Sequence, residues 1–542
     1  MTSFLLPPPD ADPAPPLEAD ASLPPLRARL LGRASRVVAW AIVVTALAYA
    51  IDGLAGLELL PPWKTLLPGG AGEPAPAREV SRERIVAATG DLDRTLDALL
   101  ARPPRAAASS VVRGPGATTA AASLAVVAHE PASADAGPGP TLASALDASL
   151  SAAPDGTIQP LENPCLREEH GACLERAMDR FYAALRRTAL GEKDAVTRIS
   201  HFGDSIIIED LWTATVRKRM QERFGDGGPG FLFLARPWEW YGHLDVELKF
   251  TDAWHFYRVT NGHAHDNLYG YGGVSFVAGG PGAKATYATV SEGPVGRAVS
   301  RCEVYYLGQP EGGDVQVSVD GVVADTFSTE APSVGSGFHL VRMPDGPHTV
   351  VVQSAGGGPV RLFGVTLERD GPGVVYDGIG LLGASARALL EPDEAHWKEQ
   401  FAHRRPDLVV LTFGTNESDH DLSMSGYREQ LQRVVRRIRA VAPFASCLLA
   451  GPPDRGDPNT RETRSIIPKL VAVQREIALA EGCAFWDTFT AMGGKNTMWR
   501  WYASNPRRAF GDLTHMAPAG GEILGDLLHA ALLQGFVDYL AR

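Results

Sequence analysis

The sequence lacks any run of Lys or Arg residues that could neutralise a phosphate backbone. Its 51 basic residues are outnumbered by 63 acidic ones, which gives a formal net charge of -12. Nucleic-acid binding depends on clustered positive charge, so nucleic acid is not expected as a partner. The glycine-rich turn at residues 225–230 lacks the Lys-Ser/Thr ending of a phosphate loop, which argues against a nucleotide site there.

Cysteine is also scarce, with five residues in a chain of 542. This number is too low for a disulfide framework, and no pair has the short spacing of a zinc site. Cys165 and Cys173 lie close together and either close a small loop in an oxidising compartment or remain free thiols. The other three, Cys302, Cys447 and Cys483, are expected to be buried thiols.

The N-terminal region has the order of charges and apolar residues that is typical of an export signal. Residues 1–26 are rich in Pro, Ala and Asp, and we predict a disordered cytoplasmic N-terminus over residues 1–36. An uncharged apolar stretch follows and predicts a transmembrane signal anchor at residues 37–60, although small residues at 46–50 leave a cleaved signal peptide as the alternative. Arginines precede the stretch and should stay cytoplasmic, which predicts a single-pass inner-membrane protein with a periplasmic catalytic domain. These arginines are Arg27, Arg29, Arg33 and Arg36.

Residues 61–160 are dominated by Ala, Pro, Gly and Ser, with one possible helix at 81–101. This composition gives no basis for a packed core, so we predict a linker between the membrane and a distant domain.

Globular patterning begins near residue 161 and changes character twice. Strand and helix patterns alternate over 161–243 and again over 374–542, which predicts an α/β domain with a doubly wound, flavodoxin-like parallel sheet. Short alternating β-branched runs fill 244–373 and predict an inserted all-β sandwich or jelly roll.

Candidate catalytic residues follow two of the predicted strands and precede the last helix. Ligands of open α/β sheets bind at the carboxyl ends of the strands. Ser205, in Gly203-Asp204-Ser205, begins a predicted helix over 206–224, where its backbone N–H faces a developing oxyanion. Asn416, in Gly-Thr-Asn-Glu, offers a neutral amide donor to the same oxyanion.

Asp512 and His515 lie three residues apart before the last predicted helix. This spacing allows the carboxylate to orient the imidazole, which then accepts the proton of a serine hydroxyl. Each of the three motifs also has a purely structural interpretation, as a helix cap or a satisfied loop. Their joint occurrence favours a serine hydrolase with Ser205 as the nucleophile.

The three motifs together resemble the sequence blocks of the SGNH, or GDSL-like, hydrolases. The resemblance covers residues 190–225 and 375–542. It implies a glycine that donates an oxyanion-hole N–H, for which Gly383 is the first candidate and Gly380 the second. The resemblance therefore implies Ser205, Asp512 and His515 as catalytic residues and Ser205, Gly383 and Asn416 as the oxyanion hole, without a metal or another cofactor.

The segment around Ser205, together with the β insertion, resembles the peptidoglycan O-acetylesterases and related acetyltransferases. The resemblance implies a serine esterase that acts on an acetylated extracytoplasmic polysaccharide, either peptidoglycan or another glycan. Members of that group often have His directly after the serine, whereas this chain has Ile206. Polysaccharide O-acetyltransfer and noncatalytic glycan binding on the same scaffold are the alternatives.

Two further groups of residues have the chemistry of binding sites. His263, His265 and Asp266 have metal-ligand side chains, but a loop at the start of a β-module is mostly solvated. Trp238, Trp240 and Tyr241 have rings that can stack on sugars, although core packing is expected for them.

Overall fold

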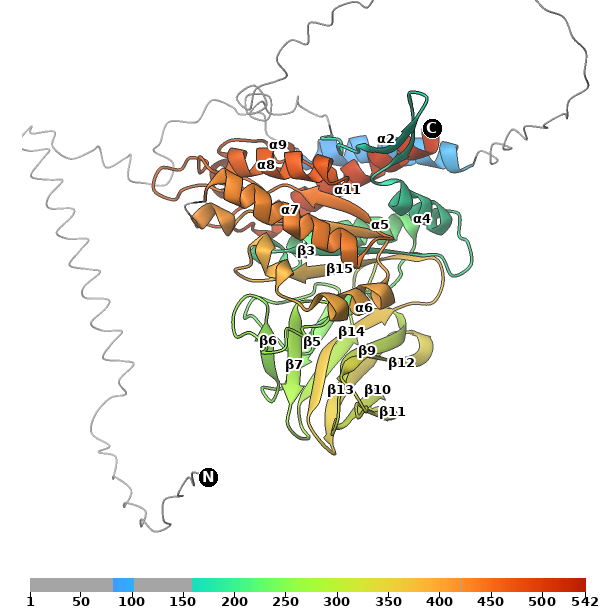
Figure 1. Ribbon diagram of the computed structural model, residues 1–542. Helices are drawn as coiled ribbons and strands as arrows, with labels where there is room; N and C mark the ends of the chain where they lie inside the picture. Colours follow the sequence, from blue (N-terminus) through green and yellow to red (C-terminus); the bar gives the residue numbers. More distant parts are fainter. Residues whose placement is uncertain (1–80, 102–157, 421) are drawn as a thin grey trace, which may run out of the picture. The chain divides into compact units, whose positions relative to one another are not determined.

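The computed structural model describes residues 81–101, 158–420 and 422–542, which Figure 1 draws in colour. All of them belong to one unit, residues 78–542. The predicted N-terminal segment 1–36 and the predicted membrane anchor 37–60 lie outside the described residues.

A five-stranded parallel sheet forms the centre of the α/β domain. Its strand order is β15-β3-β16-β17-β18, and every neighbouring pair is parallel. β15, which follows β3 in the chain, therefore lies at the edge of the sheet beside β3. β16, β17 and β18 follow in order on the other side of β3. This is the flavodoxin-like order, so the predicted doubly wound sheet is confirmed. The strands are β3 (Val196–Gly203), β15 (Gly373–Gly380), β16 (Leu408–Thr412), β17 (Ser446–Ala450) and β18 (Ala484–Trp486).

Helices cover both faces of this sheet, because successive residues of a strand point to opposite sides. In β16, Val409 and Leu411 pack into the core on the side of α6, α7 and α8. The alternate residues Leu408 and Val410 pack into the core on the side of α4, α5 and α11. These helices are α4 (Asp179–Ala189), α5 (Leu211–Phe224), α6 (Glu394–Arg404), α7 (Met424–Val441), α8 (Ile467–Ala480) and α11 (Pro518–Ala541), and two short ones, α9 (Thr488–Ala491) and α10 (Thr497–Ala503), precede α11.

Between α5 and β15 the chain forms antiparallel strands, which we call the β-module. Its two sheets have the strand orders β11-β10-β13-β8-β5 and β12-β9-β14-β7-β6, and β4 pairs with β14. The sequence places this insertion at 244–373, whereas its strands run from Gly230 to Glu368, because β4 already joins the second sheet. The strands are β4 (Gly230–Leu232), β5 (Val246–Phe250), β6 (His255–Arg258), β7 (Val274–Ala278), β8 (Lys284–Thr289), β9 (Val299–Gly308), β10 (Asp314–Val319), β11 (Val322–Ser328), β12 (Gly335–Gly346), β13 (Thr349–Gly356) and β14 (Val360–Glu368).

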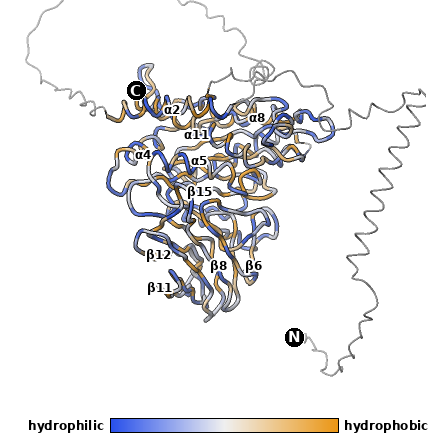
Figure 2. Tube along the Cα trace, turned by 180° about the vertical axis from the view of Figure 1, so that it is seen from behind, coloured by the Kyte–Doolittle hydropathy of each residue, from blue (hydrophilic) through white to orange (hydrophobic). Residues whose placement is uncertain are grey.

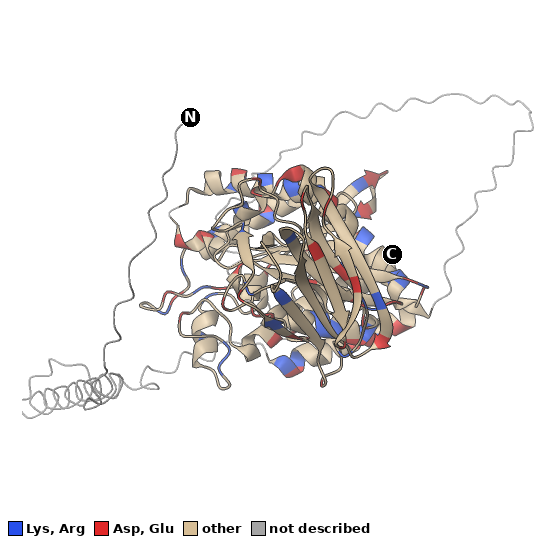
Figure 3. Ribbon diagram, turned by 90° about the horizontal axis from the view of Figure 1, so that it is seen from below, with Lys and Arg blue, Asp and Glu red and all other residues tan. Residues whose placement is uncertain are grey.

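The β-module has an apolar interior and a charged surface. Alternate residues of its central strands, such as Val315 and Val317 in β10 and Val350 and Val352 in β13, are fully buried. Figure 3 shows acidic and basic residues interspersed on the strands of the module. Every second residue along these strands is thus buried, which is the alternation from which the sequence predicts strands.

Part of the predicted linker packs against the α/β domain. Residues 82–100 form α2 (Arg82–Leu100), which contacts α11 and buries Ile85, Leu92 and Leu96. The helix predicted at 81–101 is therefore present, and it packs against the domain because these three residues form one apolar stripe. Ion pairs add to the contact: the Arg82 side chain lies 3.0 Å from Asp526 of α11.

The C-terminal helix α11 is a core element. By length and composition alone it is the one helix among the described residues that could cross a membrane. However, 72% of its most apolar window is buried inside the domain. Figure 2 shows apolar residues in orange along α2 and α11. Gly521 and Gly525 allow α11 to approach α5 closely, because a Cβ at Gly521 would lie 2.7 Å from the Cβ of Leu211.

The cysteines form two disulfides in the described residues. One joins Cys165 and Cys173 and closes the hairpin of β1 (Cys165–Glu169) and β2 (Ala172–Arg176). The other joins Cys447 and Cys483, which the sequence predicts as thiols. That prediction is wrong because β17 and β18 are neighbours, so the two Cα atoms lie 4.8 Å apart, within disulfide reach. Cys302 is free and buried.

Candidate active site

The structure brings Ser205, His515 and Asp512 into one hydrogen-bonded chain. Ser205 follows β3 directly and is 7% exposed. Its Oγ lies 2.9 Å from Nε2 of His515, and Nδ1 of the same ring lies 2.6 Å from Oδ2 of Asp512. With Asp512 on Nδ1, the ring presents Nε2 to the serine hydroxyl, which is the arrangement of a nucleophile, a general base and an orienting carboxylate.

The local backbone explains why Ser205 is presented in this way. The helix predicted at 206–224 is instead divided into a short 3₁₀ turn, η2 (Ser205–Ile207), and α5. Asp210 separates them with a φ of 61°, in the left-handed region. Asp204 caps the turn, since its Oδ1 accepts the N–H of Ile206 at 3.1 Å. The chain therefore turns sharply between strand and helix with Ser205 at the bend.

A tight turn holds Asp512 against His515. The Oδ1 atom of Asp512 accepts the N–H groups of Thr514 (3.0 Å) and His515 (3.1 Å). Leu513 between them has a φ of 51°, which folds the carboxylate back onto the ring. Burial opposes ionisation of Asp512, but the hydrogen bonds from His515 and the backbone outweigh it and lower its pKa to about 2. Asp512 is therefore an anion at neutral pH, as the orienting role requires.

The structure also joins the segments that carry Asn416 and Gly383. Asn416 follows β16, and its Nδ2 donates to the carbonyl oxygen of Ala384 at 2.8 Å. Gly383 is exposed and has a φ of 74°, a conformation that favours glycine. Gly380 has a different role, because a Cβ there would lie 2.6 Å from the Cα of Ile208. Gly380 thus allows β15 to pack against the turn after Ser205, while Gly383 remains the candidate oxyanion donor.

Two buried carboxyl groups lie beneath these segments, and the sequence motifs give neither of them a role. Glu417 is 2% exposed, and its Oε1 accepts the N–H of Ala386 at 2.8 Å. It thus connects the 3₁₀ turn η4 (Glu417–Asp419), directly after Asn416, to η3 (Ala386–Leu390), directly after the Gly383 loop. Burial raises the pKa of Glu417 to about 7, with a further contribution from Asp204. Burial likewise raises the pKa of Asp204 to about 6.

Arg455 is a third residue that the sequence motifs do not reveal. It follows β17 and donates to the carbonyl oxygen of Thr415 at 2.5 Å and to Oγ of Ser418 at 2.7 Å. It also donates to Oγ1 of Thr514 at 3.1 Å, beside His515. One guanidinium therefore holds the Asn416 loop and the His515 turn together. Its position after a parallel strand, at the same edge as Ser205, was the available sequence signal.

His201 is the other histidine close to Ser205 in the sequence, but its ring is fully buried. Nδ1 lies 2.8 Å from the hydroxyl of Tyr376 and Nε2 lies 2.6 Å from Oγ1 of Thr412. Burial lowers the pKa of His201 to about 3, so its ring is neutral. Both nitrogens are occupied by structural hydrogen bonds, which leaves His515 as the candidate base.

The aromatic cluster before β5 divides into two kinds of residue. Trp238 and Tyr241 are 5% and 6% exposed, as predicted for core packing. Trp240 is 48% exposed, and its ring meets that of His515 edge to face, with centroids 5.6 Å apart. The prediction of core packing is therefore wrong for Trp240, because it lies with Glu239 in an exposed turn.

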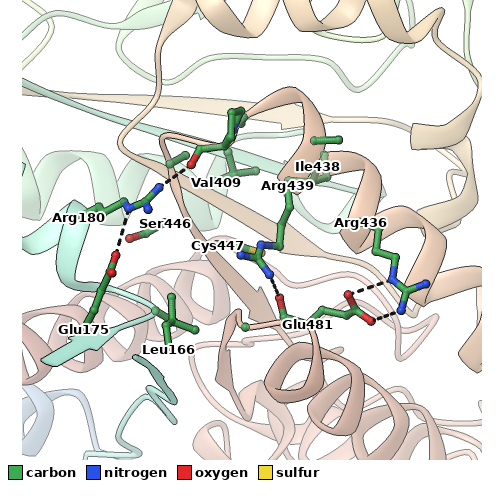
Figure 4. A pocket seen from close by; sticks show the side chains of 16 residues that line it. Leu166, Glu175, Arg180, Val409, Arg436, Ile438, Arg439, Ser446, Cys447 and Glu481 are labelled. Atoms are coloured by element: carbon green, nitrogen blue, oxygen red, sulfur yellow. Dashed lines mark hydrogen bonds and ion pairs between the residues drawn. The ribbon is translucent and has the colours of Figure 1, made fainter. Parts of the chain in front are cut away.

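The site is open to solvent. The side chains of His515 and Asp512 are 25% and 47% exposed. A cavity of about 330 Å³ lies elsewhere, near Ser446 at the amino end of β17 (Figure 4). Four of its five charged side chains pair, Arg180 with Glu175 and Arg436 with Glu481, and the fifth, Arg439, donates to the carbonyl oxygen of Glu481.

Within residues 81–101, 158–420 and 422–542, no three His, Cys, Asp or Glu side chains are grouped so that they could hold a metal ion. Of the ligand-like residues noted in the sequence, Asp266 instead pairs with Arg361 at 2.6 Å. His263 lies 3.3 Å from the hydroxyl of Tyr269.

Comparison with known proteins supports the same fold. Residues 345–523 match the model of the GDSL-like Lipase/Acylhydrolase family. The match contains Gly383, Asn416, Asp512 and His515 and begins after Ser205, which the β-module separates from them in the chain. No curated protein matches the sequence.

Among solved structures, a peptidoglycan O-acetylesterase is 23% identical, with a TM-score of 0.55, over 66% of this chain and 96% of the other. A lipase/acylhydrolase from Enterococcus faecalis is 22% identical over 30% of this chain and 77% of the other, with a TM-score of 0.24. A family two carbohydrate esterase from Clostridium thermocellum is 11% identical over 54% of this chain and 100% of the other, with a TM-score of 0.22.

The TM-score of the peptidoglycan O-acetylesterase indicates a shared fold, whereas those of the lipase/acylhydrolase and the carbohydrate esterase are too low to indicate one. The α/β domain therefore has the SGNH hydrolase fold, and residues 345–523 of the chain are similar to the GDSL-like Lipase/Acylhydrolase family.

Proposed function

We propose that this protein is a serine esterase that removes O-acetyl groups from an extracytoplasmic polysaccharide, with peptidoglycan as the first candidate. The observation that carries the proposal is the chain of hydrogen bonds from Ser205 through His515 to Asp512. Such a chain activates a hydroxyl that is otherwise a weak nucleophile at neutral pH. These hydrogen-bonded residues lie at the carboxyl edge of the parallel sheet, where ligands of open α/β sheets bind, and this position supports the proposal.

In the proposed mechanism, His515 takes the proton of Ser205 while Oγ attacks the carbonyl carbon of the ester. The oxyanion of the tetrahedral intermediate accepts hydrogen bonds from the N–H groups of Ser205 and Gly383 and from the amide of Asn416. The bond between the carbonyl carbon and the sugar oxygen then breaks, His515 protonates that oxygen to give the free sugar hydroxyl, and an acetyl group remains on Ser205. Water, deprotonated by His515, attacks this acyl-enzyme, and acetate leaves as Ser205 regains its proton. Asp512 stays ionised throughout and stabilises the imidazolium.

The openness of the site supports a polymeric substrate and hydrolysis. The exposed side chains of His515 and Asp512 lie on a surface that a chain of sugars can cross. Water reaches the same surface, which favours hydrolysis of the acyl-enzyme over transfer to another sugar. The solved structure with a TM-score of 0.55 is that of a peptidoglycan O-acetylesterase, which supports a glycan as substrate. Ile206 in place of the histidine common in that group keeps other acetylated glycans as candidates.

The proposal includes a periplasmic location. The arginines and the apolar stretch at 37–60 support a single-pass anchor in the inner membrane. The disulfides Cys165–Cys173 and Cys447–Cys483 favour an oxidising compartment. Alkaline phosphatase fused after residue 101 should be active and a cytoplasmic reporter at the same position inactive. The opposite result would contradict the location.

The enzymatic proposal is tested by offering the purified protein O-acetylated muropeptides, acetylated xylo-oligosaccharides and p-nitrophenyl acetate. Free acetate should appear in proportion to the ester that is lost. Acetyl groups that move to an added glycan acceptor, without free acetate, would indicate an acetyltransferase. Binding of the glycans without loss of any ester would indicate a noncatalytic binding protein.

A further inference from the structure

The loop between β4 and β5 holds an exposed tryptophan against the proposed catalytic base. Trp240 is 48% exposed, and its ring centroid lies 5.6 Å from that of His515, with the two ring planes at 77°. Its neighbours Trp238 and Tyr241 already supply the apolar packing of this loop, at 5% and 6% exposure. Folding of the loop therefore does not require an aromatic ring at position 240.

The same loop is fixed to the turn that carries Ser205. The N–H of Gly242 donates to the carbonyl oxygen of Ile208 at 3.3 Å, three residues after the serine. The N–H of Leu244 donates to Oδ2 of Asp210 at 2.9 Å. These bonds lie on the C-terminal side of Trp240, so the tryptophan and the nucleophile share one piece of scaffold.

A buried ion cluster stiffens that scaffold. The side chain of Arg217 in α5 is 0% exposed and lies 2.6 Å from Asp210 and 2.5 Å from Asp245, at the end of the loop. Burial opposes the charge on Asp210, but Arg217 outweighs it and lowers its pKa to about 2. The cluster therefore remains charged over the physiological pH range, and the loop is held in place. A rigid aromatic residue binds a ligand with little loss of conformational entropy.

From this geometry we infer that Trp240 forms the stacking surface of a sugar subsite beside Ser205, which receives the pyranose ring that carries the acetyl ester or its immediate neighbour. The inference rests on the proposed function and names a substrate-binding residue for it. A pyranose presents a face of C–H groups that packs on an aromatic ring, and Trp offers the largest such surface of the protein side chains. Because the ring already contacts His515, a sugar stacked on it brings its ester groups next to the hydroxyl of Ser205.

An acidic residue adjoins Trp240 in the chain. Glu239 precedes it in the same turn, and its side chain is exposed. Carboxylates accept hydrogen bonds from sugar hydroxyls, so this residue can serve the polar rim of a ring whose apolar face packs on the tryptophan.

The experiment compares Trp240→Ala, Trp240→Phe and the control Leu244→Ala in the full-length protein. Leu244 is 55% exposed on the same loop, and its substitution removes apolar surface there while it keeps the backbone N–H that donates to Asp210. For each variant, kcat and KM are measured on O-acetylated muropeptides, acetylated xylo-oligosaccharides and p-nitrophenyl acetate. Binding of the same two glycans is measured calorimetrically in the background of Ser205→Ala, which makes this readout independent of turnover.

We expect Trp240→Ala to lower kcat/KM on at least one glycan roughly tenfold more than on p-nitrophenyl acetate, mainly through KM. Glycan binding should weaken by a similar factor, Trp240→Phe should recover most of the loss, and Leu244→Ala should behave like the wild type. Equal losses on glycan and small ester, with unchanged glycan binding, would overturn the subsite and make Trp240 a positioning residue for His515. A wild type that binds glycan through Trp240 but hydrolyses no ester would refute the proposed esterase and leave the subsite standing.

Discussion

Glu417→Gln should make the stability of the protein less dependent on pH between about 5 and 8. Glu417 is 2% exposed, and its Oε2 has no hydrogen-bond partner in the described structure. Burial first, and then the charge of Asp204, raises its pKa to about 7. A carboxyl group with a raised pKa favours folding while it is protonated. That contribution is complete below the pKa of the unfolded chain and is lost as the pH rises through about 7.

The size of the effect follows from the pKa of the folded protein. A rise from 4.5 to about 7 corresponds to at most about 3 kcal/mol of stability lost on ionisation. The entropy of unfolding of a unit of this length is roughly 1 kcal/mol per degree, so the loss lowers the melting temperature by about 3 °C. Gln keeps the acceptor for the N–H of Ala386 but does not ionise. The stability of Glu417→Gln should therefore not show the decrease that ionisation of Glu417 causes in the wild type.

Thermal unfolding of the wild type and Glu417→Gln, followed across this pH range, measures the difference directly. Glu429→Gln, at an exposed position of α7, is the matched control and should run parallel to the wild type. Glu417→Ala leaves the N–H of Ala386 without its acceptor and should be less stable than Glu417→Gln at every pH. If the curves of the wild type and Glu417→Gln are parallel, the carboxyl group does not ionise in this range and the reasoning fails.

Two further predictions follow from contacts of the site, and a third concerns the disulfide between Cys447 and Cys483. Asp512→Asn should keep the fold and lower kcat by very roughly 10²- to 10⁴-fold, because the ring of His515 loses its anionic partner; near-full activity would show that Asp512 is dispensable. Arg455→Lys should lower kcat roughly tenfold with little change in KM, because one ammonium cannot bridge both loops; kinetics on p-nitrophenyl acetate decide this. The double variant Cys447→Ser, Cys483→Ser should cost about 2–4 kcal/mol in unfolding by denaturant, and an unchanged midpoint would argue against that disulfide.

The sequence predicts most of the α/β domain because its strands are strongly apolar and regularly spaced. The prediction fails where tertiary contacts decide. The helix at residues 82–100 was predicted, but its packing against α11, which buries its apolar stripe, was not. The start of the β-module at Gly230 was missed because β4 is only three residues long and is defined by its pairing with β14.

The candidate site, too, could be predicted from the sequence only in part. The motifs at the strand ends predict that Ser205, Asn416 and His515 meet, because parallel strands bring their carboxyl ends together. The roles of Glu417 and Arg455 depend on hydrogen bonds to Ala386 and Thr514, which belong to other segments. The exposure of Trp240 also depends on the fold, since the sequence alone favours a buried position for a tryptophan.

The formation of an acyl-enzyme on Ser205 tests the central claim most directly. The protein is mixed with p-nitrophenyl acetate, quenched with acid within the first turnovers, digested and analysed by mass spectrometry, while p-nitrophenol release is followed in parallel. The wild type should show one acetyl group on the peptide that contains Ser205 and continuous turnover. Ser205→Ala should show neither, whereas Ser425→Ala, at an exposed position of α7, should behave like the wild type. Undiminished turnover in Ser205→Ala, or an acetyl group on another residue of the active wild type, would contradict the account.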